Sequence, residues 1–154
     1  INPKVLKAVD EADLIIFSSG SLLTSITPHL INKTLNKAIK SSLAKKLYIC
    51  NLFTQPGETD NFKVSDHIKW LEKYLGKNTI NIVLANNQKL DNSLVNIYQT
   101  QEQKDPVILD INTLNTMNIE VISDNLAKVE DGVYRHDALK TAYLIFSYLM
   151  DCEK

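Results

Sequence analysis

Residues 46–85, KLYICNLFTQPGETDNFKVSDHIKWLEKYLGKNTINIVLA, set the fold through the order of their elements. The apolar run within 46–52 predicts a strand, and the polar connection after it carries Pro and Gly. Apolar residues over 68–75 recur at the spacing of one helix face, and Gly76 ends that helix. A further strand is expected at 81–85. A strand, a helix and another strand in this order predict a right-handed crossover and a parallel sheet.

The same alternation continues on both sides of this stretch. Upstream, the continuous apolar run 14–17 is typical of a strand buried on both faces. The elements expected elsewhere are a helix from Pro3 to about Ala12, a helix around 31–39, a short helix over 90–98, strands at 107–109 and 119–122, a turn at Gly132 and a last helix over 137–150. We therefore interpret residues 1–154 as a single α/β domain with a mostly parallel sheet.

The composition and net charge of the chain disfavour several classes of function. The 154 residues are enough for one domain with a core, and 17 basic against 18 acidic residues give a net charge of -1. This balance gives no whole-domain attraction to nucleic acid or to an anionic membrane surface. No run approaches the length of a membrane span. Cys50 and Cys152 lie far apart without metal-ligand spacing, so we expect no zinc site and two reduced thiols in a cytoplasmic protein.

The serine-rich segment 18–25 is the first candidate site. It follows a strand and opens a helix, where free N–H groups and hydroxyls can hold a phosphate, and Gly20 permits close backbone approach. The segment is neither a Walker loop nor a dinucleotide fingerprint. A serine-rich turn with Thr24 or Ser25 as a simple N-cap accounts for the same residues.

The second candidate site is the segment 51–60, followed by Ser65, Asp66 and His67. Its hydrogen-bonding side chains gather at a strand end, and ligands of parallel sheets bind beyond the carboxyl ends of the strands. Taken singly, these residues have structural explanations. Ser65 can cap the helix and Asp66 can complement its dipole. His67 can be a partly exposed helix histidine.

A third feature is the run Arg135-His136-Asp137 at the start of the last helix. Arg135 is the only arginine of the chain, and a guanidinium grips phosphate or carboxylate with two bonds. An internal Arg–Asp pair that braces the helix is the alternative, with Asp137 as the cap. The nucleophile elbow of hydrolases and the His-Glu-x-x-His zinc motif are both absent from the sequence.

At these same residues the sequence resembles a known family. The run 48–60, YICNLFTQPGETD, together with 65–68, SDHI, closely resembles the bacterial gluconeogenesis-factor family, which is related to the 2-phospho-L-lactate transferase CofD of deazaflavin cofactor synthesis. Segments 12–25, 83–86 and 135–137 agree with it as well. The family is longer, and its N-terminal glycine-rich loop is absent here. With Ile at position 1, the chain is therefore expected to be the C-terminal half.

The resemblance implies a Rossmann-like three-layer sandwich with a mostly parallel sheet, of which this chain would be the C-terminal portion of the CofD-like fold. It also implies a cytoplasmic regulator that binds a UDP-sugar or another nucleotide and serves growth on gluconeogenic carbon sources and cell shape. The residues expected to bind the ligand and its phosphates are Gly20, Ser21, Thr24, Ser25, Asn51, Thr54, Gln55, Gly57, Glu58, Thr59, Arg135 and His136.

Two alternatives stay open on the sequence. In a phospholactate transferase, Asp60, Asp66 or His67 would act as a base or as a ligand to a metal such as Mg²⁺. A weaker alternative is an NAD-binding fold without sugar specificity. In each case half of the pocket would come from outside these residues, so the 154 residues alone are expected to bind a nucleotide poorly. An exposed sheet edge would also favour a homo-oligomer.

Overall fold

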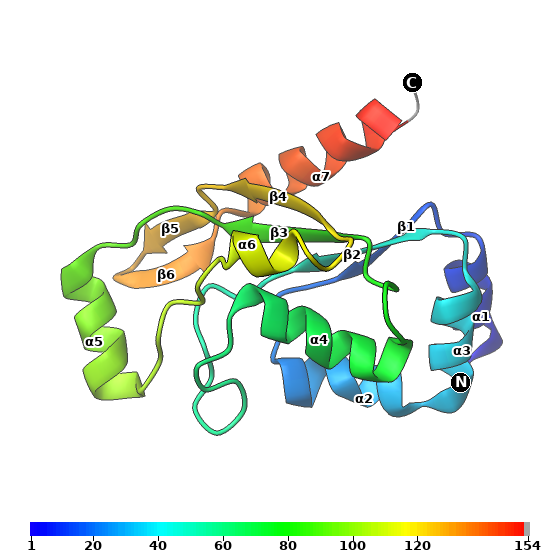
Figure 1. The fold of residues 1–154 in the computed structure, drawn as a ribbon, viewed down its shortest axis with the longest axis horizontal. Coiled ribbons are helices and arrows are strands. Elements are labelled where there is room, and N and C mark those ends of the chain that lie inside the picture. The colour runs from blue at the N-terminus through cyan, green and yellow to red at the C-terminus, as the bar shows by residue number, and fades with distance from the viewer. Residues whose placement is uncertain (153–154) are drawn as a thin grey trace.

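The computed structural model describes residues 1–152 and has a parallel sheet at its centre (Figure 1). The four strands of the sheet lie in the order β1-β2-β3-β4, and each pairs in parallel with its neighbour. Their bounds are β1 Leu14–Phe17, β2 Lys45–Ile49, β3 Ile82–Asn86 and β4 Glu120–Asp124. The predicted α/β fold with a parallel sheet is confirmed. The sequence did not predict the separate antiparallel hairpin of β5, Ala127–Glu130, and β6, Val133–His136.

Helices lie on both faces of this sheet (Figure 1). One face of the sheet carries the larger core, in which apolar residues of the helices on that face pack on Tyr48 and Val83. On the other face the last helix packs over Leu47 and Leu84 through its residues Leu144 and Ile145. The helices are α1 Pro3–Asp10, the π-helix η1 Leu22–Ile26, α2 Thr27–Ile31, α3 Lys33–Ser41, α4 Val64–Leu75, α5 Asn92–Glu102, α6 Ile111–Leu114 and α7 Ala138–Cys152.

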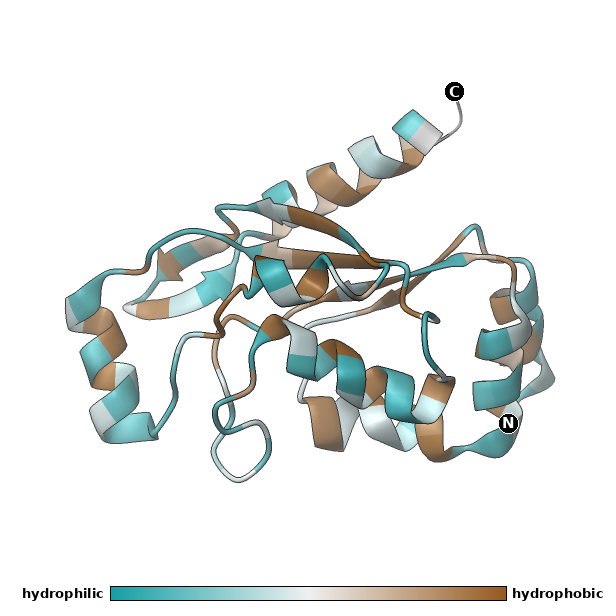
Figure 2. Ribbon diagram, viewed as in Figure 1, coloured by the Kyte–Doolittle hydropathy of each residue, from teal (hydrophilic) through white to brown (hydrophobic). Residues whose placement is uncertain are grey.

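Side-chain hydropathy explains why the strands are central (Figure 2). Leu47 and Tyr48 point to opposite faces of β2, and both have no exposed surface. The same holds for Val83 and Leu84 of β3. A strand with apolar residues at consecutive positions must have both of its faces buried. The helices that connect parallel strands bury them. Among the described residues, none of the helices combines the length and apolar character that crossing a membrane requires.

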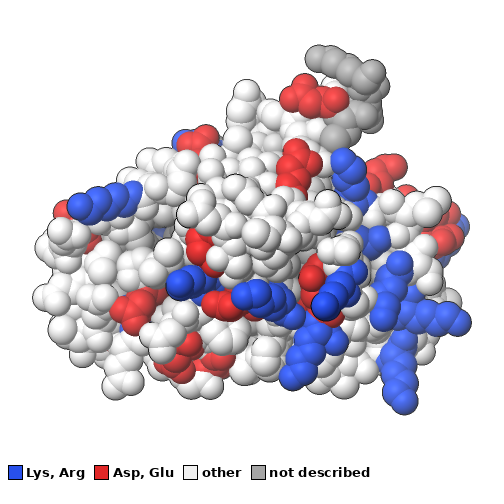
Figure 3. All heavy atoms as spheres, viewed as in Figure 1, with Lys and Arg blue, Asp and Glu red and all other residues white. Residues whose placement is uncertain are grey.

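The register places three loops side by side. Tyr48 lies next to Phe17 on one side and next to Val83 on the other, so β1, β2 and β3 end at the same edge. The segments that follow these strands, 18–25, 50–60 and 87–91, therefore meet at the carboxyl edge of the sheet. Lysines are densest at the opposite end, formed by α1 and α3, on the face drawn in Figure 3.

Two expected elements differ from the structure. Residues 107–109 are extended but form no strand of the sheet, because Val107 N bonds to Leu52 O at 2.9 Å and Ile108 O accepts from Val64 N at 3.1 Å. The segment thus lies along loops and the start of a helix. The helix expected around 31–39 is two helices, because the Asn32 side chain accepts from the N–H groups that begin α3. The Gly132 turn and the last helix are confirmed.

Candidate functional site

The loops after β1 and β2 are joined directly at the carboxyl edge. The Ser21 hydroxyl donates to Glu58 Oε2 at 2.7 Å, and the Asn51 amide donates to the Gly20 carbonyl at 3.1 Å. The structure therefore brings together the two segments that the sequence analysis treated separately. Both bonds cross between adjacent strand ends, where a parallel sheet binds its ligands.

Ser21 organises the first loop. Its Oγ accepts from Thr24 N at 3.0 Å and from Thr24 Oγ1 at 2.6 Å, so Ser21 is the N-cap of η1. The prediction that Thr24 or Ser25 is the cap was wrong, because the helix begins earlier than its apolar pattern indicated. A Cβ on Gly20 would lie 3.2 Å from Ser25 Cβ, so a larger residue would require Ser25 to move by a few tenths of an ångström.

The turn at 55–60 is held by its own side chains. The Thr59 hydroxyl accepts from Gln55 N at 2.9 Å, and the Asp60 carboxylate accepts from Gly57 N at 2.7 Å. Gly57 has φ +75°, a left-handed conformation that suits glycine. Thr59 is buried and braces the turn. The Asp60 carboxylate is exposed, but it already accepts a hydrogen bond within the turn. The conformation of the turn directs Glu58 towards Ser21.

Asn51 and Thr54 also act within the fold. The Asn51 carboxamide accepts from the Tyr48 hydroxyl at 2.9 Å while it donates to Gly20, so both of its ends are occupied. Thr54 is buried, and its hydroxyl accepts from Asp105 N at 2.9 Å. By contrast, the Gln55 side-chain oxygen is buried and has no hydrogen-bond partner among the described residues. A buried acceptor of this kind is normally paired, which makes Gln55 a candidate contact for a donor on a ligand.

His136 closes the site from the hairpin, whereas Arg135 does not reach it. His136 Nε2 donates to the Cys50 carbonyl at 3.1 Å, and Nδ1 lies 3.3 Å from the Ser19 hydroxyl. Burial lowers the pKa of His136, against a smaller opposite effect of its bond to Cys50. Arg135 alternates with His136 on β6, so it faces the other way, and its side chain is exposed. No ion pair or hydrogen bond of Arg135 is found within residues 1–152, so the alternative role of Arg135, an Arg–Asp pair that braces the helix, is not seen there.

The start of α4 has structural roles that differ from those expected. Ser65 does not cap the helix; its hydroxyl donates to Asp110 Oδ2 at 2.6 Å. Asp66 accepts from Lys63 N at 3.1 Å in the first turn, as expected for a residue that stabilises the helix start. The expectation of a partly exposed His67 was wrong, because its side chain is completely buried. His67 Nδ1 donates to the Lys63 carbonyl at 2.9 Å. Neither Asp66 nor His67 forms a hydrogen bond or an ion pair with Ser21 or Glu58.

The site contains few groups that could hold a metal. No set of three or more His, Cys, Asp or Glu side chains within residues 1–152 has the arrangement of a metal site. Glu58 is the one carboxylate bonded to the first loop, and Ser21 adds a hydroxyl. Mg²⁺ is commonly held by one or two carboxylates and by the phosphates of a substrate, so these two residues fit a metal that arrives with a phosphate ligand. Burial raises the pKa of the nearby Cys50 thiol, which is a free thiol.

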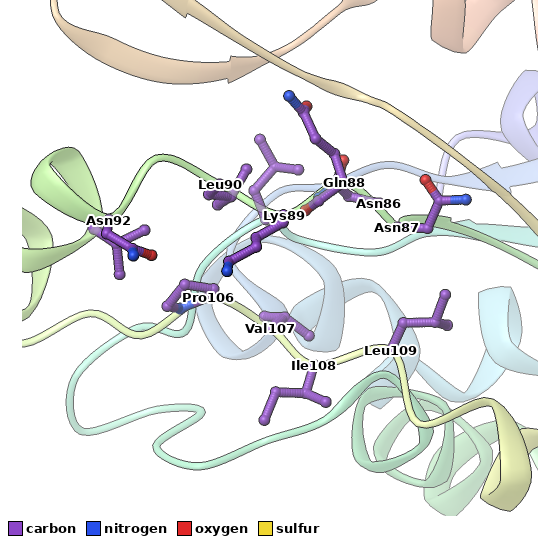
Figure 4. Close-up of a pocket in the computed structure, with 12 residues that line it drawn as sticks. Asn86, Asn87, Gln88, Lys89, Leu90, Asn92, Pro106, Val107, Ile108 and Leu109 are labelled. Atoms are coloured by element: carbon purple, nitrogen blue, oxygen red, sulfur yellow. The ribbon is translucent and has the colours of Figure 1, made fainter.

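Sequence reasoning missed a groove at the end of β3, which we call the amide groove (Figure 4). It has a volume of about 470 Å³ and lies between the turn after β3 and the extended segment 106–109. Its position beside the first site follows from Leu52, which lines the groove and is next to Asn51 in the chain. Residues with carboxamide, ammonium and apolar side chains line it: Leu52, Asn86, Asn87, Gln88, Lys89, Leu90, Asn92, Val95 and 106–109.

Comparison with known protein families identifies the family of this chain. The profile of the family described as 2-phospho-L-lactate transferase CofD matches residues 1–127. The chain belongs to the CofD family. The matched range includes both loops of the site and the amide groove, and it ends before the hairpin strand that carries His136.

Within this family, the similar proteins are gluconeogenesis factors. The gluconeogenesis factor of Bacillus subtilis is 37% identical over 149 residues, which are 97% of this chain and 47% of that protein. The putative gluconeogenesis factor of Thermotoga maritima is 42% identical over 146 residues, 93% of this chain and 46% of that protein. A crystal structure of a UPF0052 family member from Bacillus halodurans matches with a TM-score of 0.88 and 34% identity, over 94% of this chain and 46% of that one. The chain thus spans about half the length of these relatives.

Proposed function

We propose that this chain forms one wall of a nucleotide-sugar site in a cytoplasmic gluconeogenesis factor, a regulator that responds to a UDP-sugar. The observation that carries the proposal is the Ser21–Glu58 bond of 2.7 Å, which joins the loops after β1 and β2 at the carboxyl edge of the sheet. Gln55 adds a buried oxygen that lacks a donor. The relatives named gluconeogenesis factor support the biological role.

The charge of Glu58 is compatible with a sugar beside its carboxylate, or with a phosphate that a divalent cation bridges to it. A carboxylate accepts hydrogen bonds from sugar hydroxyls, whereas it repels a phosphate unless a cation lies between them. Arg135 is exposed and alternates with His136 on β6, so it points away from the residues that His136 contacts. Lys89, which lines the amide groove, has no ion-pair partner among the described residues and supplies a positive charge at this edge.

Calorimetry of the full-length protein with UDP-N-acetylglucosamine tests the proposal. We expect binding in the wild type and about 10-fold weaker binding in Ser21→Ala, because the hydroxyl both caps η1 and positions Glu58. Ser41→Ala is the matched control, since Ser41 is exposed at the C-terminal end of α3. An absence of heat at millimolar UDP-sugar would overturn the proposal.

The match to the transferase family supports a second candidate, the transfer of a phospholactyl group from a nucleoside diphosphate to a deazaflavin. Of the three residues suggested for catalysis, Asp60 is used in its turn, Asp66 at a helix start, and His67 is buried. A turnover assay with the activated phospholactate and a deazaflavin decides between the candidates. Product formation by the full-length protein would favour the transferase.

A further inference from the structure

Lysines gather at the end of the molecule that α1 and α3 form (Figure 3). Lys33, Lys37 and Lys40 of α3 follow one another at intervals of four and three residues, so they share one side of this helix. Leu35 and Ile39, on the opposite side, are buried in the core. All three lysines are exposed. We call this outer side of α3 the lysine face.

No ion pair neutralises the lysine face. The helix contains no acidic residue, and its three lysines form no ion pair within the described part of the chain. Glu11, at the end of α1, is already paired with Lys7 at 3.5 Å. The net charge of the chain is only -1, so the positive charge here comes from an uneven distribution of charged residues. A local patch of this kind attracts an anionic surface even though the whole chain does not.

Exposed apolar groups accompany the lysines. A hollow of about 440 Å³ lies between α1 and α3, and Leu6, Lys33 and Lys37 are among the residues that line it. The long stems of the two lysines add apolar surface below their ammonium groups. Ile31, directly before α3, is 63% exposed, and Leu43, directly after it, is completely exposed. This end of the molecule therefore combines positive charge with apolar side chains that reach into solvent.

We propose that the lysine face docks the protein reversibly on an anionic phospholipid membrane, with the ammonium groups at the lipid phosphates and Leu43 inserted between the headgroups. Each lysine close to an anionic bilayer favours binding, and an inserted apolar side chain adds to it. The inference goes beyond the proposed function and does not depend on it. Ser21 and Glu58 meet at the carboxyl edge, at the opposite end of the sheet, so the docked protein keeps this site open to solvent.

The residue types favour a membrane over a macromolecule with a defined shape. Protein interfaces are enriched in aromatic residues and arginine and depleted in lysine, and single-stranded nucleic acids stack on aromatic residues and arginine. The helix α3 contains neither an arginine nor an aromatic residue. Lysines are point charges on flexible stems, which suits mobile headgroups that offer no fixed geometry. Duplex nucleic acid also presents phosphates, but it has no apolar layer into which Leu43 could insert.

Co-sedimentation of the full-length protein with vesicles tests the docking. At low salt we expect binding to vesicles of phosphatidylcholine and phosphatidylglycerol in equal parts, no binding to phosphatidylcholine alone, and a loss of binding as salt screens the charges. Lys33→Glu/Lys37→Glu should bind the mixed vesicles more than about 10-fold more weakly. Lys104→Glu/Lys128→Glu is the matched control, because it changes the net charge equally at lysines that are paired with glutamates outside the lysine face. A wild type that does not sediment with the mixed vesicles, or an equal loss in both double variants, would overturn the inference.

A second variant separates a membrane from a soluble polyanion. Leu43→Ser should weaken binding to the mixed vesicles about 10-fold and leave any binding to duplex DNA or to poly-glutamate unchanged, because neither polymer buries the leucine. Ile97→Ser, at an exposed position of α5, is the control. Vesicle binding that does not change in Leu43→Ser, or tighter binding of the wild type to either polymer than to the vesicles, would assign the face to a nucleic acid or an acidic protein and overturn the inference. UDP-N-acetylglucosamine binding should be the same in all these variants, so a failure of docking leaves the proposed function intact.

Discussion

At the scale of single residues, the candidate site contains two kinds of side chain. Some form hydrogen bonds that stabilise the fold, and others remain available to a ligand. Thr59 and Asp60 are used within their turn, and Asn51 is occupied at both ends of its carboxamide. Glu58 is different, because its carboxylate reaches across to Ser21 of the other loop. The residue types alone could not separate these roles, since each of them can hydrogen-bond either to a ligand or to the chain.

The charge of the Glu58 carboxylate leads us to expect that UDP-sugar binding depends on a divalent cation. A phosphate close to this carboxylate would be repelled unless Mg²⁺ lies between them. In the full-length protein, removal of divalent cations with EDTA is therefore expected to weaken UDP-sugar binding about 10-fold. Glu58→Gln keeps an acceptor for Ser21 and removes the charge, so its affinity should not change with EDTA. Calorimetry with and without Mg²⁺ measures this, and a wild type that is indifferent to EDTA would place the phosphates away from Glu58.

The buried His67 and the half-buried His136 predict how the stability of the fold depends on pH. Burial lowers the pKa of both His67 and His136 in the folded chain, against an unfolded value of about 6.5. Below about pH 6.5 the unfolded chain therefore binds more protons than the folded chain does. The free energy of unfolding decreases as a result. The stabilisation is complete above that pH and is lost as the pH falls towards the folded pKa values.

Urea unfolding at about pH 7.5 and about pH 5.5 measures this loss. His67→Phe should reduce the difference between the two pH values, because the ring at this position packs against Tyr48 and Phe62 and no longer titrates. His29→Gln is the control, since His29 is exposed on α2. A pH dependence that is the same in His67→Phe and the wild type would contradict the assignment to His67.

At the scale of elements, the start of α4 is fixed from outside the helix. Both Ser65 N and Ser65 Oγ donate to the Asp110 carboxylate, at 3.1 Å and 2.6 Å. Burial alone would raise the pKa of Asp110, but the hydrogen bonds to its carboxylate, those from Ser65 foremost, together lower it. The residue that was expected to cap α4 instead ties the helix to the segment before α6. This contact keeps 106–109 in place as a wall of the amide groove.

Asp110→Ala is therefore expected to destabilise the fold by about 1–2 kcal/mol, because it leaves two donors at the start of α4 without their acceptor. The free energy of unfolding in urea measures the change. Asp10→Ala, at the exposed end of α1, is the matched control and should lie within about 0.5 kcal/mol of the wild type. An Asp110→Ala variant as stable as this control would show that the contact contributes little.

At the scale of the whole molecule, one face of α7 has no cover. Leu139, Tyr143, Phe146 and Met150 recur along one side of the helix and are 85%, 68%, 63% and 47% exposed. Ile16 of β1 is 46% exposed beside them and lines the same apolar hollow as Tyr143 and Phe146. In Figure 1, α7 extends beyond the sheet, and β1 is an edge strand. Contiguous apolar surface of this kind marks an interface.

The isolated 154 residues are expected to self-associate through this face. Phe146→Lys should shift the chain towards a monomer in size-exclusion chromatography with light scattering, because it places a charge in the apolar stripe. Ile97→Lys is the control, since Ile97 is 44% exposed on α5. Monomeric behaviour of the unmodified chain at high concentration would contradict the expectation.

We also expect the isolated chain to bind a UDP-sugar more than about 10-fold more weakly than the full-length protein, because a ligand at a sheet edge needs both walls of its pocket. The relatives are about twice as long as this chain, so the second wall would come from the sequence they have in addition. Calorimetry on both proteins under the same conditions makes the comparison. Equal affinity would mean that residues 1–154 contain the complete site.

The sequence alone determined the parallel α/β fold and placed the two candidate loops after its strands. Strand and helix periods are local, and consecutive apolar residues such as Leu47 and Tyr48 demand cover on both faces wherever the strand lies. The tertiary structure alone decided which side chains meet. Ser21 with Glu58, Ser65 with Asp110, and the walls of the amide groove come from segments far apart in the chain. Their contacts depend on strand register and loop path, which no local pattern records, and for that reason the groove could not be predicted from the sequence.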